Sequence, residues 1–233
     1  MKNRLQIFLC AACACVLIAG GVVGFWRPGL LRGQSNDGHQ LGGDLLAEVP
    51  GNTIAAFKIG IRDYEASPEW KYSECDVRET IDNRLVLFHD WDLSNIPDSE
   101  LNRSVVGEPV GGRPINELTL DQLQTLQLLG DHRIPTLEEM LQTAAEIGPA
   151  KPILLEIKLL HSDTARERMI ELAMQYRDEH DLEIHFLAFI RNVNRSFPEP
   201  QHWLDRISDA GFRVYQVYRP KVAEYDLCET WND

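Results

Sequence analysis

The chain has 233 residues, 44% of them hydrophobic, which is enough to bury the core of one ordinary to large domain. Its formal net charge of −13 argues against a nucleic-acid-binding surface, which would be basic, and against broad electrostatic docking on anionic lipid. A phosphate-binding site on this acidic protein must therefore be positive locally, through lysine, histidine or a bound cation.

The first residues predict a membrane segment that is separate from the folded domain. Lys2 and Arg4 precede an apolar run over residues 7–26, which is about as long as a bilayer requires. We expect residues 1–28 to form an uncleaved single-pass anchor, with a cleaved signal peptide as the alternative. The short N-terminal tail favours an extracytoplasmic domain, which would be secreted if the segment is cleaved.

Residues 29–38 are polar and contain glycine, so they predict a linker that leads into one domain over residues 39–233. In that domain, short apolar segments alternate with amphipathic segments that have helix-capping residues at their start. This alternation indicates an α/β fold with a parallel sheet. The expected helices cover residues 54–61 (capped by Asn52 or Thr53), segments beginning at Leu120 and Leu137, residues 163–179 and residues 202–210. The expected strands lie around Glu74–Val77 and at Leu85–Phe88, Pro152–Lys158, Ile184–Ile190 and Phe212–Tyr218.

The first two expected strands carry a carboxylate pair and a histidine. Glu74 and Asp76 are two apart and share one face of a strand, whereas Cys75 faces the other way as a small buried hydrophobe. Such a pair is usually tolerated only where a cation lies between the carboxylates or water reaches both. His89 directly follows the strand Leu85–Phe88. This combination suits metal-assisted phosphate chemistry, and a solvated edge strand with an incidental histidine is the alternative.

The expected strand Pro152–Lys158 adds a third carboxylate. Glu156 and Lys158 lie on one face of this strand, and Ile157 lies on the other. Glu156 could complete an oxygen-rich site for a divalent cation, and Lys158 could pair with a phosphate oxygen.

Several short motifs occur in an order that resembles the glycerophosphodiester phosphodiesterase family, within the phospholipase C-like phosphodiesterase superfamily. Each motif is weak singly, but their order along the chain is specific, and the resemblance extends from about His39 to Lys158. The motifs are Asn52-Thr53-x-x-Ala56-Phe57, Glu74-x-Asp76, His89-Asp90, Ile134-Pro135-Thr136-Leu137-Glu138-Glu139 and Glu156-Ile157-Lys158.

The resemblance implies a TIM-barrel-like (β/α) fold. Because only five convincing strands are found after His39, we expect the barrel to be abbreviated or open. It also implies that Glu74, Asp76 and Glu156 bind one divalent cation, Mg²⁺ or Ca²⁺.

The resemblance further assigns acid–base roles to His39 and His89 and phosphate binding to Lys158 and position 40. The family has arginine at that position, followed by glycine, and this chain has Gln40. The family also usually has glutamate where Gly51 stands, so one polar contact is missing.

The implied function is hydrolysis of a glycerophosphodiester to glycerol 3-phosphate and an alcohol, which the sequence does not identify. Two alternatives stay open. The first is a phospholipase C-like enzyme that acts on intact lipid. The second is a membrane-tethered binding module whose catalysis is impaired by the missing arginine, glutamate and late strands.

Overall fold

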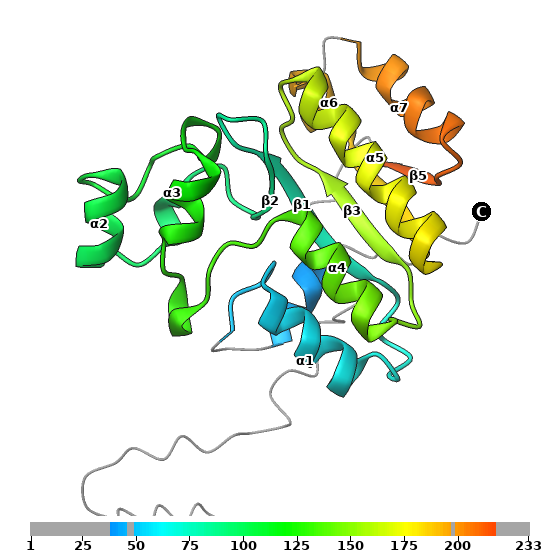
Figure 1. Ribbon diagram of the computed structural model, residues 1–233, viewed down its shortest axis with the longest axis horizontal. Coiled ribbons are helices and arrows are strands. Elements are labelled where there is room, and N and C mark those ends of the chain that lie inside the picture. The colour runs from blue at the N-terminus through cyan, green and yellow to red at the C-terminus, as the bar shows by residue number, and fades with distance from the viewer. Residues whose placement is uncertain (1–37, 46–48, 197–198, 218–233) are drawn as a thin grey trace, which may run out of the picture. The chain divides into compact units, whose positions relative to one another are not determined.

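The computed structural model describes residues 38–45, 49–196 and 199–217. Within these ranges five strands form one sheet in the order β2-β1-β3-β4-β5 (Figure 1). Neighbouring strands from β1 to β5 are parallel, whereas β2 pairs with β1 in the antiparallel direction. The strands are β1 (Ser73–Glu79), β2 (Leu85–Leu87), β3 (Ile153–Ile157), β4 (Ile184–Phe189) and β5 (Val214–Val217). All five expected strands are therefore present and the predicted α/β fold is confirmed, with a sheet that is parallel except at β2.

The helices follow the capping signals of the sequence. Thr53, Thr119, Thr136 and Ser162 each accept a hydrogen bond from a backbone N–H in the first turn of their helix, and Thr119 and Thr136 form complete capping boxes. The α-helices of the described residues are α1 (Ile54–Tyr64), α2 (Glu100–Val106), α3 (Leu120–Thr125), α4 (Leu137–Ile147), α5 (Asp163–His180), α6 (Ile190–Ser196) and α7 (Pro200–Asp209).

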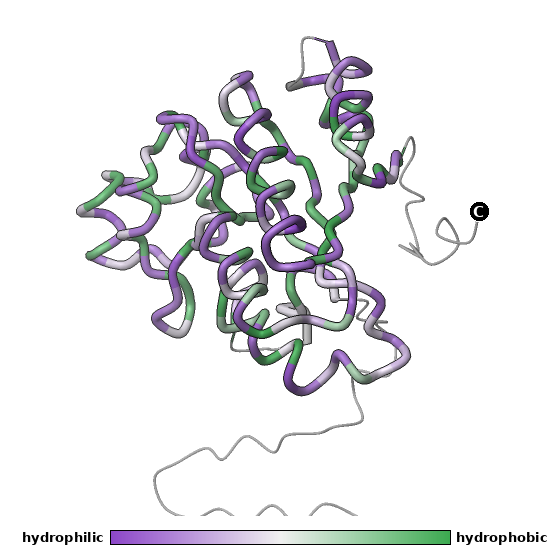
Figure 2. The backbone as a smooth tube through the Cα atoms, turned by 45° about the vertical axis from the view of Figure 1, so that its right-hand side comes forward, coloured by the Kyte–Doolittle hydropathy of each residue, from purple (hydrophilic) through white to green (hydrophobic). Residues whose placement is uncertain are grey.

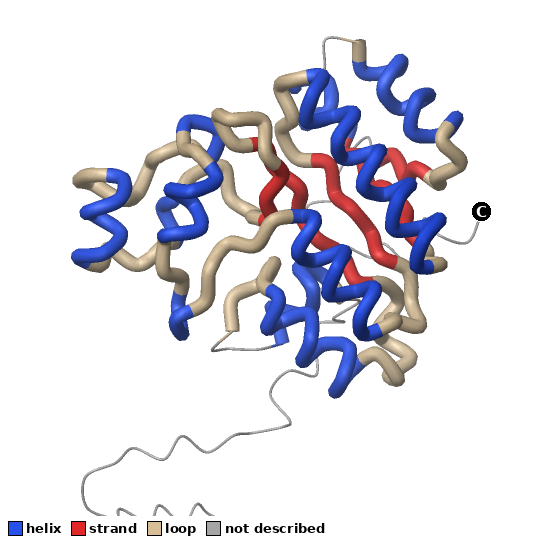
Figure 3. The backbone as a smooth tube through the Cα atoms, in the orientation of Figure 1, coloured by secondary structure: helices blue, strands red, loops and turns tan. Residues whose placement is uncertain are grey.

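The main hydrophobic core lies between one face of the sheet and a layer of helices that includes α1, α4 and α5 (Figures 1 and 3). Every second strand residue contributes to this core. Cys75, Leu155 and Phe186, which lie side by side on β1, β3 and β4, are examples and are fully buried. The tube coloured by hydropathy shows helices along which hydrophobic and hydrophilic residues alternate (Figure 2). Because side chains alternate along a strand, the residues between these core positions face away from the helices.

The opposite face of the sheet carries the polar residues of β1 and β3 and a small apolar cluster that includes Leu154, Leu187 and Phe189. Within the described residues, β2 and β5 are the edges of the sheet, and no pairing joins them. This open arrangement agrees with the expectation of an abbreviated or open barrel.

A segment between β2 and α4 has a hydrophobic cluster of its own, built on Val86 and on residues such as Leu93, Val110 and Leu123. It contains α2, α3 and the short 3-10 helices η2 (Leu93–Asn95), η3 (Ile115–Glu117) and η4 (Leu129–Asp131). The helix α2 is not among the helices expected from the sequence, so it is a correction. Ser99 caps this helix, which is only two turns long, and prolines on both sides hide its periodicity in the sequence.

The residues around His39 are more regular than the expected loop. They form η1 (His39–Leu45), in which Gln40, Leu41 and Gly42 all have positive φ angles. Leu41 is fully buried, and η1 packs closely on α1 and β1. This contact requires Gly60 in α1, because a Cβ atom there would lie 2.4 Å from the Trp70 ring and 3.0 Å from the Leu41 carbonyl oxygen.

No helix among the described residues is long and apolar enough to cross a membrane. The predicted anchor at residues 1–28 and most of the predicted linker lie outside the described residues.

Candidate functional site

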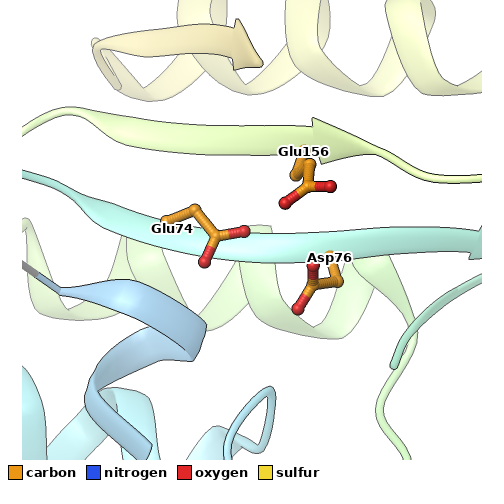
Figure 4. Close-up of side chains that lie close together, drawn as sticks. All are labelled: Glu74, Asp76 and Glu156. Atoms are coloured by element: carbon orange, nitrogen blue, oxygen red, sulfur yellow. The ribbon is translucent and has the colours of Figure 1, made fainter. Parts of the chain in front are cut away.

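Three carboxylates gather on the face of the sheet opposite the helices. Glu74 and Asp76 project from β1, and Glu156 projects from β3 toward the same space (Figure 4). Asp76 and Glu156 are direct partners in the parallel register, and each of the three residues offers an oxygen within 4.8 Å of the others. All three are buried. Glu74 and Asp76 lie in the middle of β1 and not at its end. Among the predicted site residues, only His89 and Lys158 come after the end of a strand, β2 and β3 respectively.

The ammonium group of Lys158 lies between two of these carboxylates. Its Nζ atom is 2.7 Å from Asp76 Oδ1 and 2.5 Å from Glu156 Oε1. The side chain is 11% exposed, so the two ion pairs are largely shielded from water. Lys158 thus supplies a cation between Asp76 and Glu156, whereas the expected cation between Glu74 and Asp76 is not this lysine.

Burial and neighbouring charges raise the pKa values of Glu74 and Glu156 and lower the pKa of Asp76. Burial, and then repulsion from Asp76, raise the pKa of Glu74 well above its usual range. Burial also raises the pKa of Glu156 to about 7, and Lys158 offsets only part of this effect. Burial acts in the same direction on Asp76, but Lys158, His89 and Asn52 more than offset it and lower the pKa of Asp76.

The Lys158 ammonium stays charged beside these carboxylates. Burial would lower its pKa, but attraction to Asp76 and Glu156 raises the pKa to about 12. One ammonium cannot neutralise three ionised carboxylates, so a further positive charge is needed before all three can ionise.

One oxygen of Glu74 is suited to bind a cation. Its Oε2 accepts a hydrogen bond of 2.8 Å from the Gln40 backbone N–H and lies 3.9 Å from His39 Nε2. Its Oε1 is buried and has no hydrogen-bond partner within the described part of the chain. A buried polar atom of this kind calls for a ligand, and carboxylate oxygens are the ligands that hard divalent cations prefer. The three carboxylates therefore fit a metal ion.

The Asn52 side chain fixes the orientation of Asp76. Its Nδ2 donates to Asp76 Oδ2 at 2.6 Å, and its Oδ1 accepts from the Asp76 backbone N–H at 2.9 Å. Asn52 has a φ angle of 58°, a left-handed conformation that asparagine tolerates better than most residues. From the sequence Asn52 is a possible helix cap, but the structure gives that role to Thr53 and places Asn52 in the site.

The two predicted histidines face each other beside the carboxylates. The ring centroids of His39 and His89 are 6.5 Å apart, with their planes nearly perpendicular. His89 Nδ1 lies 2.8 Å from Asp90 Oδ1, and the other oxygen of Asp90 accepts from Asn95 at 2.7 Å. Because a carboxylate only accepts hydrogen bonds, Asp90 favours the proton on Nδ1 and leaves Nε2 for proton transfer. The structure thus brings His39 into the site.

Arg78 is a site residue that sequence reasoning missed. It lies on the same face of β1 as Asp76, and its guanidinium donates to the carbonyl oxygens of Phe88 at 2.9 Å and His89 at 2.6 Å. Burial lowers the pKa of Arg78, and attraction to Asp76, Glu156 and Asp90 opposes this. The sequence does contain one signal for Arg78. Glu74, Asp76 and Arg78 are each two residues apart on one strand, so all three share the same face of the sheet.

The chain matches a known protein family. A model of the glycerophosphoryl diester phosphodiesterase family matches residues 45–188, which is more than half of the chain. The chain belongs to this family. No functionally curated protein matches the chain.

Two solved structures have a similar fold at low sequence identity. A candidate glycerophosphodiester phosphodiesterase from Galdieria sulphuraria is 20% identical, with a TM-score of 0.53 over 78% of this chain and 66% of that protein. Another from Silicibacter pomeroyi is 19% identical, with a TM-score of 0.53 over 76% of this chain and 63% of that protein. The chain thus spans slightly less than two thirds of each. These likenesses place its mixed α/β fold with TIM-barrel phosphodiesterase structures.

The structure brings the predicted site residues of this phosphodiesterase family member together in one place. Gln40 differs from the others in that its backbone, and not its side chain, contacts the carboxylate cluster. Glu74, Asp76, Glu156, Lys158, His39 and His89 lie together as described above. Gln40, predicted to bind phosphate, uses its backbone to hold Glu74 and the Asn52 N–H. Its side chain lies against Gly51, where a Cβ atom would be 2.5 Å from Gln40 Oε1.

We predict that metal affinity rises with pH. The pKa of Glu156 is raised to about 7, so below that pH a proton competes with the cation for this carboxylate. Mg²⁺ or Ca²⁺ affinity, measured by calorimetry, should therefore rise as the pH is raised toward 7, and the raised pKa of Glu74 acts in the same direction. Glu156→Gln should weaken binding and flatten the profile, whereas Glu138→Gln, at an exposed carboxylate, should change neither. An affinity that is independent of pH would contradict this.

We also predict that Arg78 positions His89. In Arg78→Met, the carbonyl groups of Phe88 and His89 lose their donor, and turnover should fall about 10–100-fold while metal affinity is retained. Hydrogen exchange at the amides around His89 should become faster, and Arg78→Lys should recover part of both properties. The matched control is Arg84→Met, at an exposed arginine in the turn after β1. Unchanged exchange and turnover in Arg78→Met would show that β2 alone fixes His89.

Proposed function

We propose that this chain is a metal-dependent phosphodiesterase that hydrolyses glycerophosphodiesters to glycerol 3-phosphate and an alcohol. The observation that carries the proposal is the meeting of a buried carboxylate triad and two facing imidazoles at one place. Carboxylates of this kind bind a hard cation, and imidazoles transfer protons near neutral pH. Membership of the glycerophosphoryl diester phosphodiesterase family supports the same reaction.

Glu74, Asp76 and Glu156 would hold the cation, either Mg²⁺ or Ca²⁺. When bound, such a cation supplies Lewis-acid stabilisation of the negative charge on the phosphoryl group. The protein prepares this site in advance, because Asn52 orients Asp76 and the Gln40 backbone orients Glu74.

The two histidines would divide the proton transfers. One imidazole removes a proton from the attacking nucleophile as its oxygen bonds to phosphorus, and the other donates a proton to the alcohol oxygen as its bond to phosphorus breaks. Asp90 holds the His89 ring in one tautomer, so Nε2 is the nitrogen that exchanges the proton. His39 is about half exposed and lies near Glu74, on the other side of the space between the rings.

Lys158 would contact the phosphate. The Lys158 ammonium is close enough to the carboxylates to stabilise charge on a phosphate oxygen beside them. Gln40 offers a neutral amide where the family has an arginine, and a lost charge-assisted hydrogen bond reduces activity by about one to two decades. We therefore infer a weaker enzyme than a relative with that arginine.

The deciding test is turnover of glycerophosphocholine and of a phosphatidylinositol, with and without Mg²⁺ or Ca²⁺. We predict metal-dependent hydrolysis of the first substrate only, and a loss of about 10²–10⁴-fold in kcat in His89→Ala with metal affinity retained. His202→Ala, at an exposed histidine of α7, is the matched control and should retain full activity. Full activity in a chelator would refute the metal assignment. Turnover of the intact lipid alone would favour a phospholipase C-like enzyme, and no turnover a binding module.

We further propose that residues 1–28 tether the enzyme to the membrane with its domain on the extracytoplasmic side. The apolar run over residues 7–26 supports this placement. We predict that the full-length protein stays in the membrane pellet after carbonate extraction and keeps its original N-terminus. A soluble protein with a new N-terminus near residue 25 would instead identify a cleaved signal peptide.

A further inference from the structure

A cavity of about 320 Å³ opens beside His89. The loop before α1, the end of β2 and the segment that carries η2 and η4 contribute its described walls. Gln40 and Asn52 also line it, and these residues hydrogen bond to Glu74 and Asp76 respectively. The cavity is therefore next to the carboxylates and to one of the two imidazoles, which is where one half of a phosphodiester would extend.

The described walls of this cavity are mainly apolar. The apolar side chains are Val49, Pro50, Phe88, Ile96, Pro97, Leu128 and Leu129. Asp90 is the one carboxylate among the described lining residues, and hydrogen bonds to His89 and Asn95 already engage it. No lysine or arginine is found among these residues. A ligand in the cavity would thus meet these apolar side chains together with the uncharged amides of Gln40, Asn52 and Asn95 and the imidazole of His89.

The composition of the walls discriminates between the two halves of the proposed substrate. The glycerol half carries two hydroxyl groups, which lose hydrogen bonds to water when they are buried against apolar side chains. The alcohol half has no such requirement if it is aliphatic. A quaternary ammonium group such as choline favours several aromatic faces, and Phe88 is the one phenyl ring in the described walls.

We propose that this cavity binds the alcohol half of the substrate and selects alcohols that carry an aliphatic chain. The inference rests on the proposed hydrolysis of glycerophosphodiesters and adds the substrate class. Gln40 and Gly51 suit this selectivity, because they line the cavity close to each other and neither carries a charge.

The test is a series of glycerophosphodiesters whose alcohols are ethanol, butanol, hexanol and octanol. Burial of each added methylene should raise kcat/KM by up to about fourfold until the chain fills the cavity. The gain should appear as a lower KM at constant kcat, because the chain contacts the wall equally in the ground state and the transition state. Glycerophosphocholine should be a poorer substrate than the hexanol ester.

Variants locate the effect in the cavity. Leu129 lines it and is 58% exposed, so Leu129→Asn should fold and should lower the ratio of kcat/KM between the octanol and ethanol esters. The matched control is Leu101→Asn, because Leu101 is 44% exposed on α2 and is not a described lining residue. That variant should keep the wild-type ratio. Equal ratios in both variants would overturn the assignment of the cavity.

Uncleavable ligands separate this inference from the proposed function. Glycerol alkylphosphonates, in which a P–C bond replaces the scissile P–O bond, report binding to the full chain with metal present. If no ester is hydrolysed but phosphonate affinity rises with chain length, the cavity inference stands and the proposed reaction is wrong. If the esters are hydrolysed at rates independent of chain length, the reaction stands and the cavity inference is wrong. Flat responses in both series would overturn both.

Discussion

The ion pairs of Lys158 with Asp76 and Glu156 are the interaction on which the centre of this protein depends. Burying several carboxylates on adjacent strands is costly, because each loses its hydration and repels the others. A buried ammonium within 2.7 Å of two of them offsets that repulsion. The third carboxylate, Glu74, is held by a backbone N–H and keeps one oxygen without a partner among the described residues. The lysine therefore offsets enough of the carboxylate repulsion for the protein to fold, and Glu74 still offers an oxygen to a cation.

The same alternation along β1 and β3 builds both the core and the site. Cys75 and Val77 enter the helix-covered core, whereas Glu74, Asp76 and Arg78 face the other way. The parallel register then sets Asp76 directly beside Glu156. A slip of one residue would place carboxylates among the core helices, so the hydrophobic layer strongly specifies the register that also assembles the site. Stability and function are linked here through strand geometry.

The predictable parts of this molecule are those that depend on local pattern. Strand alternation located Glu74, Asp76 and Glu156, and polar caps such as Thr136 located the helices. The role of Arg78 could not be predicted, because its partners are carbonyl groups of another strand end, which the sequence does not display. The conformation of η1 was missed for a different reason. Its successive left-handed residues include Gln40 and Leu41. The packing of η1 on α1 and β1 and the backbone hydrogen bonds of Gln40 to Glu74 and Asn52 stabilise them, and neither is visible in the local sequence.

The conformation of Gln40 also explains how the side chain at this position can change while the three carboxylates remain in place. Gln40 supports the cluster with its backbone, since its N–H binds Glu74 and its carbonyl oxygen accepts the Asn52 N–H. Any residue that tolerates the left-handed conformation can supply these two groups, so the side chain at this position is not fixed by the carboxylate cluster. That side chain contacts Gly51 and lines the apolar cavity. Substitution here can therefore alter which substrates bind without dismantling the site that would act on them.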